Sequence, residues 1–169
     1  MGSARLSHHG HVSDHDTAAK ELDQAESVLA ANKDAVAQAD LDEERARILR
    51  VRLEHAVARK DIATAQKLLA ELQKMAGSGS ISIQRTYSGA AGTLLLAQKK
   101  YRDAAAELEQ DFMNPISMKL LVTAYEKSKA NGPAEEWRKR LLDWKIPTVE
   151  EALVVFAYRA QQEAMAAKK

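Results

Sequence analysis

A run of imidazole and carboxylate side chains stands near the start of the chain, in the stretch HHGHVSDHD at residues 8–16. Its candidate metal ligands are His9, His11, Asp14 and His15. Neutral imidazole nitrogens and carboxylate oxygens at this density can chelate Zn, Ni or Cu. Two interpretations follow. One is a functional site in a metal-binding protein or metal-dependent enzyme, and the other is a terminus that binds Zn or Ni opportunistically.

Other catalytic chemistry is scarce in the sequence. The histidine run is similar to the His-x-His-x-Asp-His signature of metallo-hydrolases, but an extra residue separates His11 from Asp14. His55 is the only histidine outside the run and lacks the second histidine of a zincin motif. The GSGS stretch at residues 77–80 has no lysine in the spacing of a phosphate loop. We therefore predict a protein that is not an enzyme and needs no cofactor.

The net charge and the hydropathy of the sequence limit the kinds of partner that we expect the protein to bind. The formal net charge of +1 gives no electrostatic reason to expect nucleic acid. No apolar run reaches the ~20 residues of a membrane span, and no leader peptide is visible. Met1-Gly2-Ser3 is typical of a cloning remnant that replaces a leader. The compartment thus stays open between the cytoplasm and the periplasm or secretion, and the expected partner is a protein or peptide.

Helical periodicity fills the rest of the chain. We predict an all-α fold of about seven helices in antiparallel pairs, because no segment alternates as a strand. A helix from about Thr17 to residue 39, with Asp16 as its N-cap, is expected to break near Asn32. Capping boxes are predicted at Asp40–Glu43 and Thr148–Glu151, and Pro115 suits a first helical turn. The expected organisation is a flexible N-terminus at residues 1–15 and a single domain at residues 16–169.

One spacing of apolar side chains recurs along the chain. Its copies are Ile62–Ala65–Leu69, Tyr101–Ala104–Leu108 and, less regularly, Ala134–Trp137–Leu141. In each copy the residues lie three and then four apart, so that they share one helical face. The copies start 39 and 33 residues apart, and the GSGS stretch falls in the longer interval. This recurrence predicts a helical repeat, with an irregular helical bundle as the alternative.

The stretch SGAAGTLLLAQKKYRDAAAELEQDFMNP resembles the tetratricopeptide repeat family, whose unit is a pair of helices of ~34 residues. Gly92, Tyr101, Ala104, Leu108 and Pro115 match that family's small, aromatic, small, large and proline positions. The resemblance covers roughly residues 41–145 and implies a right-handed array of helix pairs, with the last helix as a polar-faced cap. The chain departs from it at Leu53 and Trp137, where the family prefers small residues.

The resemblance also implies a site. The family binds partners on a concave face formed by the first helix of each pair, and the matching positions carry more cations than acids. Such a face favours a peptide with acidic side chains or a free carboxylate. Glu54, Thr93 and Thr123 replace the asparagines of the family's chaperone-tail clamps, so that specialised role is not implied. The predicted face consists of Arg47, Arg50, Glu54, Arg85, Thr93, Lys119, Thr123 and Lys127.

Trp137 and Trp144, seven residues apart, share one predicted helix face. Core packing is the simpler role for two such side chains. The alternative is a hydrophobic contact surface, which would make the protein a structural helical oligomer.

Overall fold

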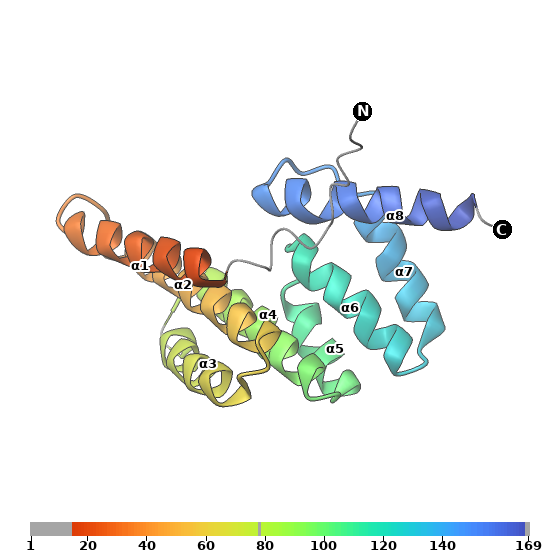
Figure 1. The fold of residues 1–169 in the computed structure, drawn as a ribbon, viewed down its shortest axis with the longest axis horizontal. Helices are drawn as coiled ribbons and strands as arrows, with labels where there is room; N and C mark the ends of the chain where they lie inside the picture. Colours follow the sequence, from red (N-terminus) through yellow and green to blue (C-terminus); the bar gives the residue numbers. More distant parts are fainter. Residues whose placement is uncertain (1–14, 78, 168–169) are drawn as a thin grey trace. The chain divides into compact units, whose positions relative to one another are not determined.

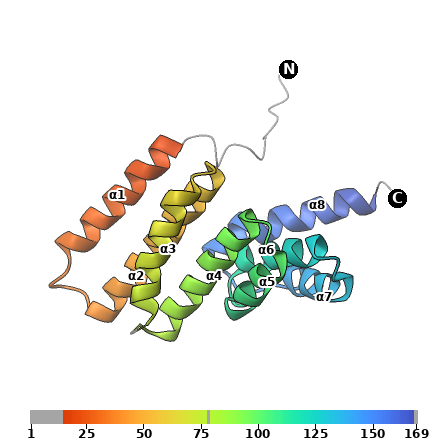
Figure 2. The same ribbon diagram turned by 90° about the horizontal axis from the view of Figure 1, so that it is seen from below.

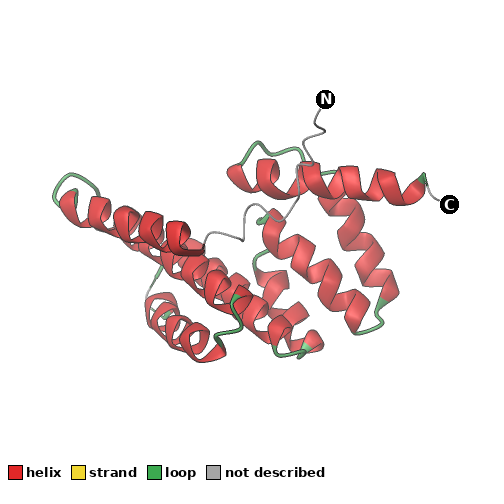
Figure 3. Cartoon of the chain, viewed as in Figure 1, coloured by secondary structure: helices red, strands yellow, loops and turns green. Residues whose placement is uncertain are grey.

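The computed structural model describes residues 15–77 and 79–167. Across these ranges the chain forms eight α-helices and one π-helical turn, η1, with no β-strand (Figures 1 and 3). This confirms the predicted all-α class. The elements are α1 (His15–Ala31), α2 (Gln38–Ala58), α3 (Ile62–Ala76), α4 (Ile81–Ala97), α5 (Tyr101–Gln110), α6 (Pro115–Lys127), α7 (Asn131–Leu142), η1 (Glu151–Val155) and α8 (Phe156–Ala166).

The chain divides into two compact units, residues 1–84 and 85–169, with the boundary just after the first turn of α4. In unit 1, α2 packs against both α1 and α3, and the three helices lie side by side in Figure 2. In unit 2, α6 packs against α5 and α7 and also contacts η1. Within each unit, consecutive packed helices such as α2 and α3, or α6 and α7, run in opposite directions, which is consistent with the predicted antiparallel pairs (Figure 1).

Local hydrogen bonds define where several helices begin. The Asn114 side chain accepts from the amides of Ile116 (2.8 Å) and Ser117 (3.4 Å), and Pro115 occupies the first turn of α6 as predicted. Thr148 Oγ1 accepts from the Glu151 amide at 3.1 Å, which confirms the Thr148 half of that capping box.

Two other N-cap predictions were wrong. Asp16 is the second residue of α1, because the helix begins at His15. Asp40 lies inside the first turn of α2, whose N-cap is Ala37. Glu43 accepts instead from the Ser80 hydroxyl at 2.6 Å, so it joins α2 to the segment before α4. The predicted break near Asn32 is confirmed, since α1 ends at Ala31.

The turns at Lys60, Lys99 and Lys129 share one backbone conformation. Their φ angles are 62°, 61° and 62°, in the left-handed region that non-glycine residues seldom adopt. At the second turn the Lys99 amide donates to Leu96 O and the Lys100 amide to Leu95 O, both at 3.0 Å, and equivalent pairs close the other two turns. This is the Schellman arrangement that ends a helix. It joins α2 to α3, α4 to α5 and α6 to α7.

A buried alanine follows each of these lysines by five residues: Ala65, Ala104 and Ala134. Each of these alanines donates its amide to the carbonyl four residues earlier, in the first turn of the second helix. Ala134 therefore corresponds to Ala65 and Ala104. The sequence prediction instead aligned Ala134 with Ile62 and Tyr101. This alignment was wrong by three residues, because the three-then-four spacing occurs again within α7. The turns recur at intervals of 39 and 30 residues.

Replacing Lys99 by glycine is expected to raise the free energy of unfolding by about 0.5–1 kcal/mol. The left-handed conformation costs an L-residue roughly 1–2 kcal/mol, and glycine's larger entropy loss on folding offsets part of the gain. Urea denaturation followed by circular dichroism measures the difference. Lys119→Gly, at an exposed position inside α6, is the control and should lower stability by about 1 kcal/mol. A loss of similar size for Lys99→Gly would contradict the expectation.

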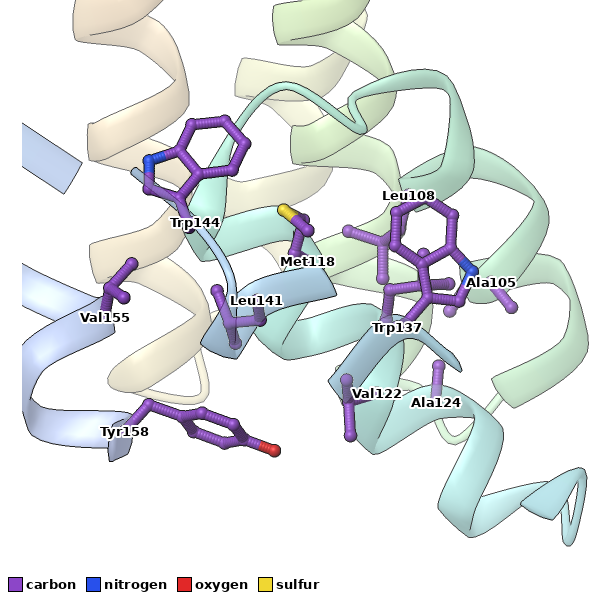
Figure 4. Packing of buried hydrophobic residues seen from close by; sticks show 12 residues of the cluster. Ala105, Leu108, Met118, Val122, Ala124, Trp137, Leu141, Trp144, Val155 and Tyr158 are labelled. Carbon is purple, nitrogen blue, oxygen red and sulfur yellow. The ribbon is translucent and has the colours of Figure 1, made fainter. Parts of the chain in front are cut away.

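Twelve buried hydrophobic side chains of unit 2 form one cluster around α6 (Figure 4). Trp137 and Trp144 belong to it and are only 8% and 9% exposed. The indole N–H of Trp144 donates to Ile146 O at 2.9 Å. Core packing is thus confirmed as the role of both tryptophans. The cluster consists of Ala104, Ala105, Leu108, Met118, Leu121, Val122, Ala124, Trp137, Leu141, Trp144, Val155 and Tyr158.

Gly92 lies where the backbone of α4 approaches α5 within unit 2. A Cβ atom added there would stand 2.4 Å from Leu108 Cγ and 3.1 Å from the Ala104 carbonyl oxygen. Contacts this short cannot form without moving a helix, because protein interiors are close-packed. A small residue at this crossing is therefore required by packing.

α8 follows α7 and is attached to its end by Arg159. The Arg159 guanidinium donates from Nε to Leu142 O at 2.9 Å and from an Nη atom to Trp144 O at 2.5 Å. Val155 and Tyr158 enter the core, but Val149, Leu153 and Phe156 are 73%, 51% and 58% exposed. The terminal segment expected to be a polar cap thus exposes apolar side chains just before η1, within η1 and at the first residue of α8.

Candidate functional site

The predicted binding residues of α2 are held by ion pairs within unit 1. Arg47 is exposed and pairs with Glu44 one turn earlier. Arg50 is buried, and its Nε donates to Glu54 Oε1 at 2.8 Å. Charged groups that are buried need such partners, because the desolvation of an isolated charge is costly. Arg50 and Glu54 thus have a structural role in α2, and of the three only Arg47 extends into solvent.

In unit 2 both predicted threonines bond to their own helix. Thr93 is buried, and its hydroxyl donates to Gly89 O at 2.9 Å. The hydroxyl of Thr123, which is half-buried, donates to Lys119 O at 3.2 Å. Side-chain bonds to the carbonyl four residues back are common for threonine in helices. Thr93 is consequently closed to a partner, whereas Thr123 remains partly accessible.

The exposed part of the predicted site in unit 2 is a row on α6, formed by Lys119, Thr123 and Lys127. We call it the α6 lysine row. Its members are four residues apart and share one helix face. Both lysines are exposed, and neither forms an ion pair with any described residue. At 1.5 Å rise per residue, the two lysine Cα atoms lie about 12 Å apart along the helix. The row presents two free cations at a fixed separation.

Residues 112–113, between α5 and α6, add an apolar contact that the sequence prediction missed. Phe112 and Met113 are 44% and 47% exposed. The guanidinium of Arg85, from the predicted site, lies 5.3 Å from the centre of the Phe112 ring. This geometry is a cation–π interaction, which leaves the arginine charge partly accessible. Two consecutive large apolar residues just before Asn114-Pro115 were the available signal.

A short hydrogen bond joins α5 to α6 through Tyr125. Its hydroxyl donates to Glu109 Oε1 at 2.5 Å. Burial, followed by this hydrogen bond and the nearby carboxylates, raises the pKa of Tyr125 to about 12. The hydroxyl therefore stays protonated at neutral pH. The stabilisation that it provides is complete below pH ~10, the ordinary tyrosine pKa, and is lost as pH rises towards 12.

The predicted metal ligands His9, His11 and Asp14 lie outside the described residues, and His15 is the first residue of α1. Within the part of the chain that the structure describes, no three histidine, aspartate or glutamate side chains gather in a metal-binding arrangement. His55 lines a cavity between α1, α2 and α3.

Comparisons with protein-family models, with curated proteins and with solved structures find no match. Among the described residues, no helix has the length and apolarity needed to cross a bilayer.

Proposed function

We propose that the chain is a non-enzymatic, tetratricopeptide-like helical module that binds a peptide or partner protein. The observation that carries the proposal is the α6 lysine row: two exposed cations without ion-pair partners, on the first helix of a hairpin whose turn occurs three times. The other two first helices, α2 and α4, end in the same left-handed lysine turn. Repeated helix pairs that expose the faces of their first helices are a common architecture for partner binding.

The chemistry of the row favours an acidic ligand. Lysine ammonium groups bind carboxylates through charge-assisted hydrogen bonds, and Thr123 supplies a hydroxyl between them. An extended peptide advances about 3.3 Å per residue, so carboxylates about four residues apart would match a separation of about 12 Å. A terminal carboxylate together with an acidic side chain would match it equally well.

The test uses the full chain as bait in an affinity capture from cell lysate, with bound proteins identified by mass spectrometry. The variant is Lys119→Glu/Lys127→Glu, and we expect it to lose an acidic partner that the wild type retains. Lys67→Glu/Lys74→Glu on α3 is the matched control, because it makes the same charge change at two exposed lysines of a second helix. The control should retain the partner.

Titration of the identified partner then gives the affinity. We expect the α6 variant to bind at least tenfold more weakly and the wild-type affinity to fall as salt rises, since exposed charges are screened. If the wild type, the α6 variant and the control all bound the partner equally well, the α6 lysine row would not be the binding site of that partner.

A further inference from the structure

A second row of cations runs along α2. Arg45, Arg52 and Arg59 are seven residues apart, which is close to two helical turns, so they share one side of the helix and its C-cap. At 100° per residue, this side is roughly opposite the one that carries Arg50 and Glu54. It faces α1, as the ion pairs of Arg52 with Asp23 (2.6 Å) and Glu26 (3.1 Å) show. We call these three residues the α2 arginine row.

α1 supplies ion-pair partners to only the middle member of this row, Arg52. Arg45 and Arg59 form no ion pair with any described residue. Asp42 and Asp61 lie beside the same cavities, but Asp42 accepts a hydrogen bond from Gln38, and Asp61 caps α3 by accepting from the Thr64 amide. Hydrogen bonds from Thr64 lower the pKa of Asp61, and the charge of Arg59 helps to lower it, although the Arg59 and Asp61 side chains form no ion pair. Even Arg52 is incompletely paired, because its shielded Nε has no hydrogen-bond partner. The row therefore has more capacity for carboxylates than α1 supplies.

Two cavities show that α1 also fits this side of α2 poorly. One, of about 620 Å³, is lined by Leu29, Ala30, Lys33, Leu41 and Arg45 among others. The other, of about 260 Å³, is lined by Ala19, Leu22, Arg52, Ala56 and Arg59 among others. The first thus places the cation of Lys33 beside that of Arg45. The ion pairs of Arg52 lie between the two cavities, because Arg52 lines the smaller cavity and both Asp23 and Glu26 line the larger one.

The burial of α1 agrees with this loose fit. None of its described side chains is fully buried, and Leu22, Ala25 and Leu29 are only half-buried. Its attachment to α2 thus depends strongly on the Arg52 ion pairs, which are partly exposed to solvent and screened by salt.

We infer that the α2 arginine row is the binding surface for an acidic amphipathic helix of a partner protein, and that α1 is a weakly held occupant which such a helix replaces. The partner helix would carry leucines in the positions of Leu22 and Leu29. It would carry carboxylates opposite all three arginines rather than opposite Arg52 alone. This is the recognition of an amphipathic helix in a groove, with charge complementarity selecting the partner. The inference uses a different helix and a different unit from the α6 lysine row and stands independently of it.

The probe is a fluorescein-labelled synthetic peptide of residues 15–31 with Ala19→Glu and Ala30→Glu. Ala30 shares the cavity of Arg45 and Ala19 that of Arg59, so these changes place carboxylates beside the two unpaired arginines. A peptide with glutamine at both positions is the control ligand. Fluorescence anisotropy measures binding of the peptide to the wild-type full chain and to a full-chain variant with Asp23→Asn/Glu26→Gln. This double substitution removes the ion pairs that attach α1 to Arg52.

We expect the glutamate peptide to bind the Asp23→Asn/Glu26→Gln chain about tenfold more tightly than the wild type, because the competing α1 is released. Adding Arg45→Gln/Arg59→Gln should weaken binding about tenfold, whereas Arg102→Gln, at an exposed arginine of α5, should leave it unchanged. The glutamine peptide should bind at least fivefold more weakly than the glutamate peptide.

Equal binding of the two peptides, or binding that is insensitive to Arg45→Gln/Arg59→Gln, would overturn the inference. A concentration-dependent dimer of the Asp23→Asn/Glu26→Gln chain would also overturn it, by assigning the surface to the α1 of a second copy. If that chain does not fold, hydrogen exchange on the wild type decides the question. Excess glutamate peptide should then speed exchange in residues 17–31, and unchanged exchange would refute displacement of α1.

Discussion

Gly92→Ala is expected to lower the free energy of unfolding of unit 2 by about 1–3 kcal/mol, although alanine is the better helix former. The new methyl group would lie 2.4 Å from Leu108 Cγ and 3.1 Å from the carbonyl oxygen of Ala104. Leu108 is fully buried, and the carbonyl belongs to the α5 backbone, so relief requires the two helices to separate. Overpacking of this kind typically costs 1–3 kcal/mol, and the helix propensity of alanine recovers at most ~1 kcal/mol.

The matched control for this change is Gly132→Ala in the first turn of α7. Apart from its own chain neighbours, a Cβ atom there meets nothing within 4 Å. Pro133 follows directly, and a residue with a Cβ before proline is disfavoured in helical conformation, which opposes the gain in helix propensity. We therefore expect stability to change by less than about 0.5 kcal/mol. Both tryptophans of the chain lie in unit 2, so their fluorescence during urea denaturation reports on this unit. Gly92→Ala should therefore lower the midpoint, whereas Gly132→Ala should leave it nearly unchanged. A stabilising Gly92→Ala would show that α4 and α5 do not pack closely.

Trp137→Ala is expected to destabilise unit 2 by about 3–5 kcal/mol, the usual cost of deleting a large buried aromatic side chain. Its indole is 8% exposed and belongs to the central cluster with Leu108 and Leu141. Such a loss is a large share of the 5–15 kcal/mol that stabilises an ordinary domain. Thermal unfolding followed by circular dichroism, together with the fluorescence of Trp144, measures it.

An exposed side chain next to the indole of Trp137 provides a control that distinguishes loss of core packing from loss of a surface contact. The guanidinium of Arg140 lies 4.5 Å from the centre of its ring and pairs with Glu136 at 2.6 Å. Arg140→Gln removes the cation–π contact but leaves the core intact, so we expect a cost of about 1 kcal/mol or less. If Trp137→Ala cost no more than Arg140→Gln, the tryptophan would act as a surface contact rather than as part of the core.

The fold was largely predictable because it depends on local features of the sequence. The spacing of Tyr101, Ala104 and Leu108 indicated one face of α5, and Ala104 and Leu108 are indeed buried. The left-handed turns could not be predicted, because lysine has no preference for positive φ. Without those turns as reference points, the third copy was aligned on the apolar spacing of α7 and placed three residues out of register.

The candidate site was less predictable, because burial at a helix face depends on neighbours distant in the sequence. Arg50 and Thr93 have ordinary polar side chains that become buried in the fold, whereas Lys119 and Lys127 extend into solvent. The α2 arginine row could have been found from its seven-residue spacing in the sequence. Only the position of α1 shows that Arg52 forms ion pairs with two of its carboxylates while Arg45 and Arg59 form none with described residues.

The apolar side chains exposed before and at the start of α8 have a consequence for protein engineering. Val149, Leu153 and Phe156 already provide the exposed side chains against which a further helix can pack. A designed helical hairpin fused after α8 would bury them at roughly 25 cal/mol per Å² of apolar surface. Its connection could copy the left-handed turn of Lys99, with glycine in place of the lysine. Unit 2 is therefore suited to extension by one repeat at a time, as a building block for longer helical arrays.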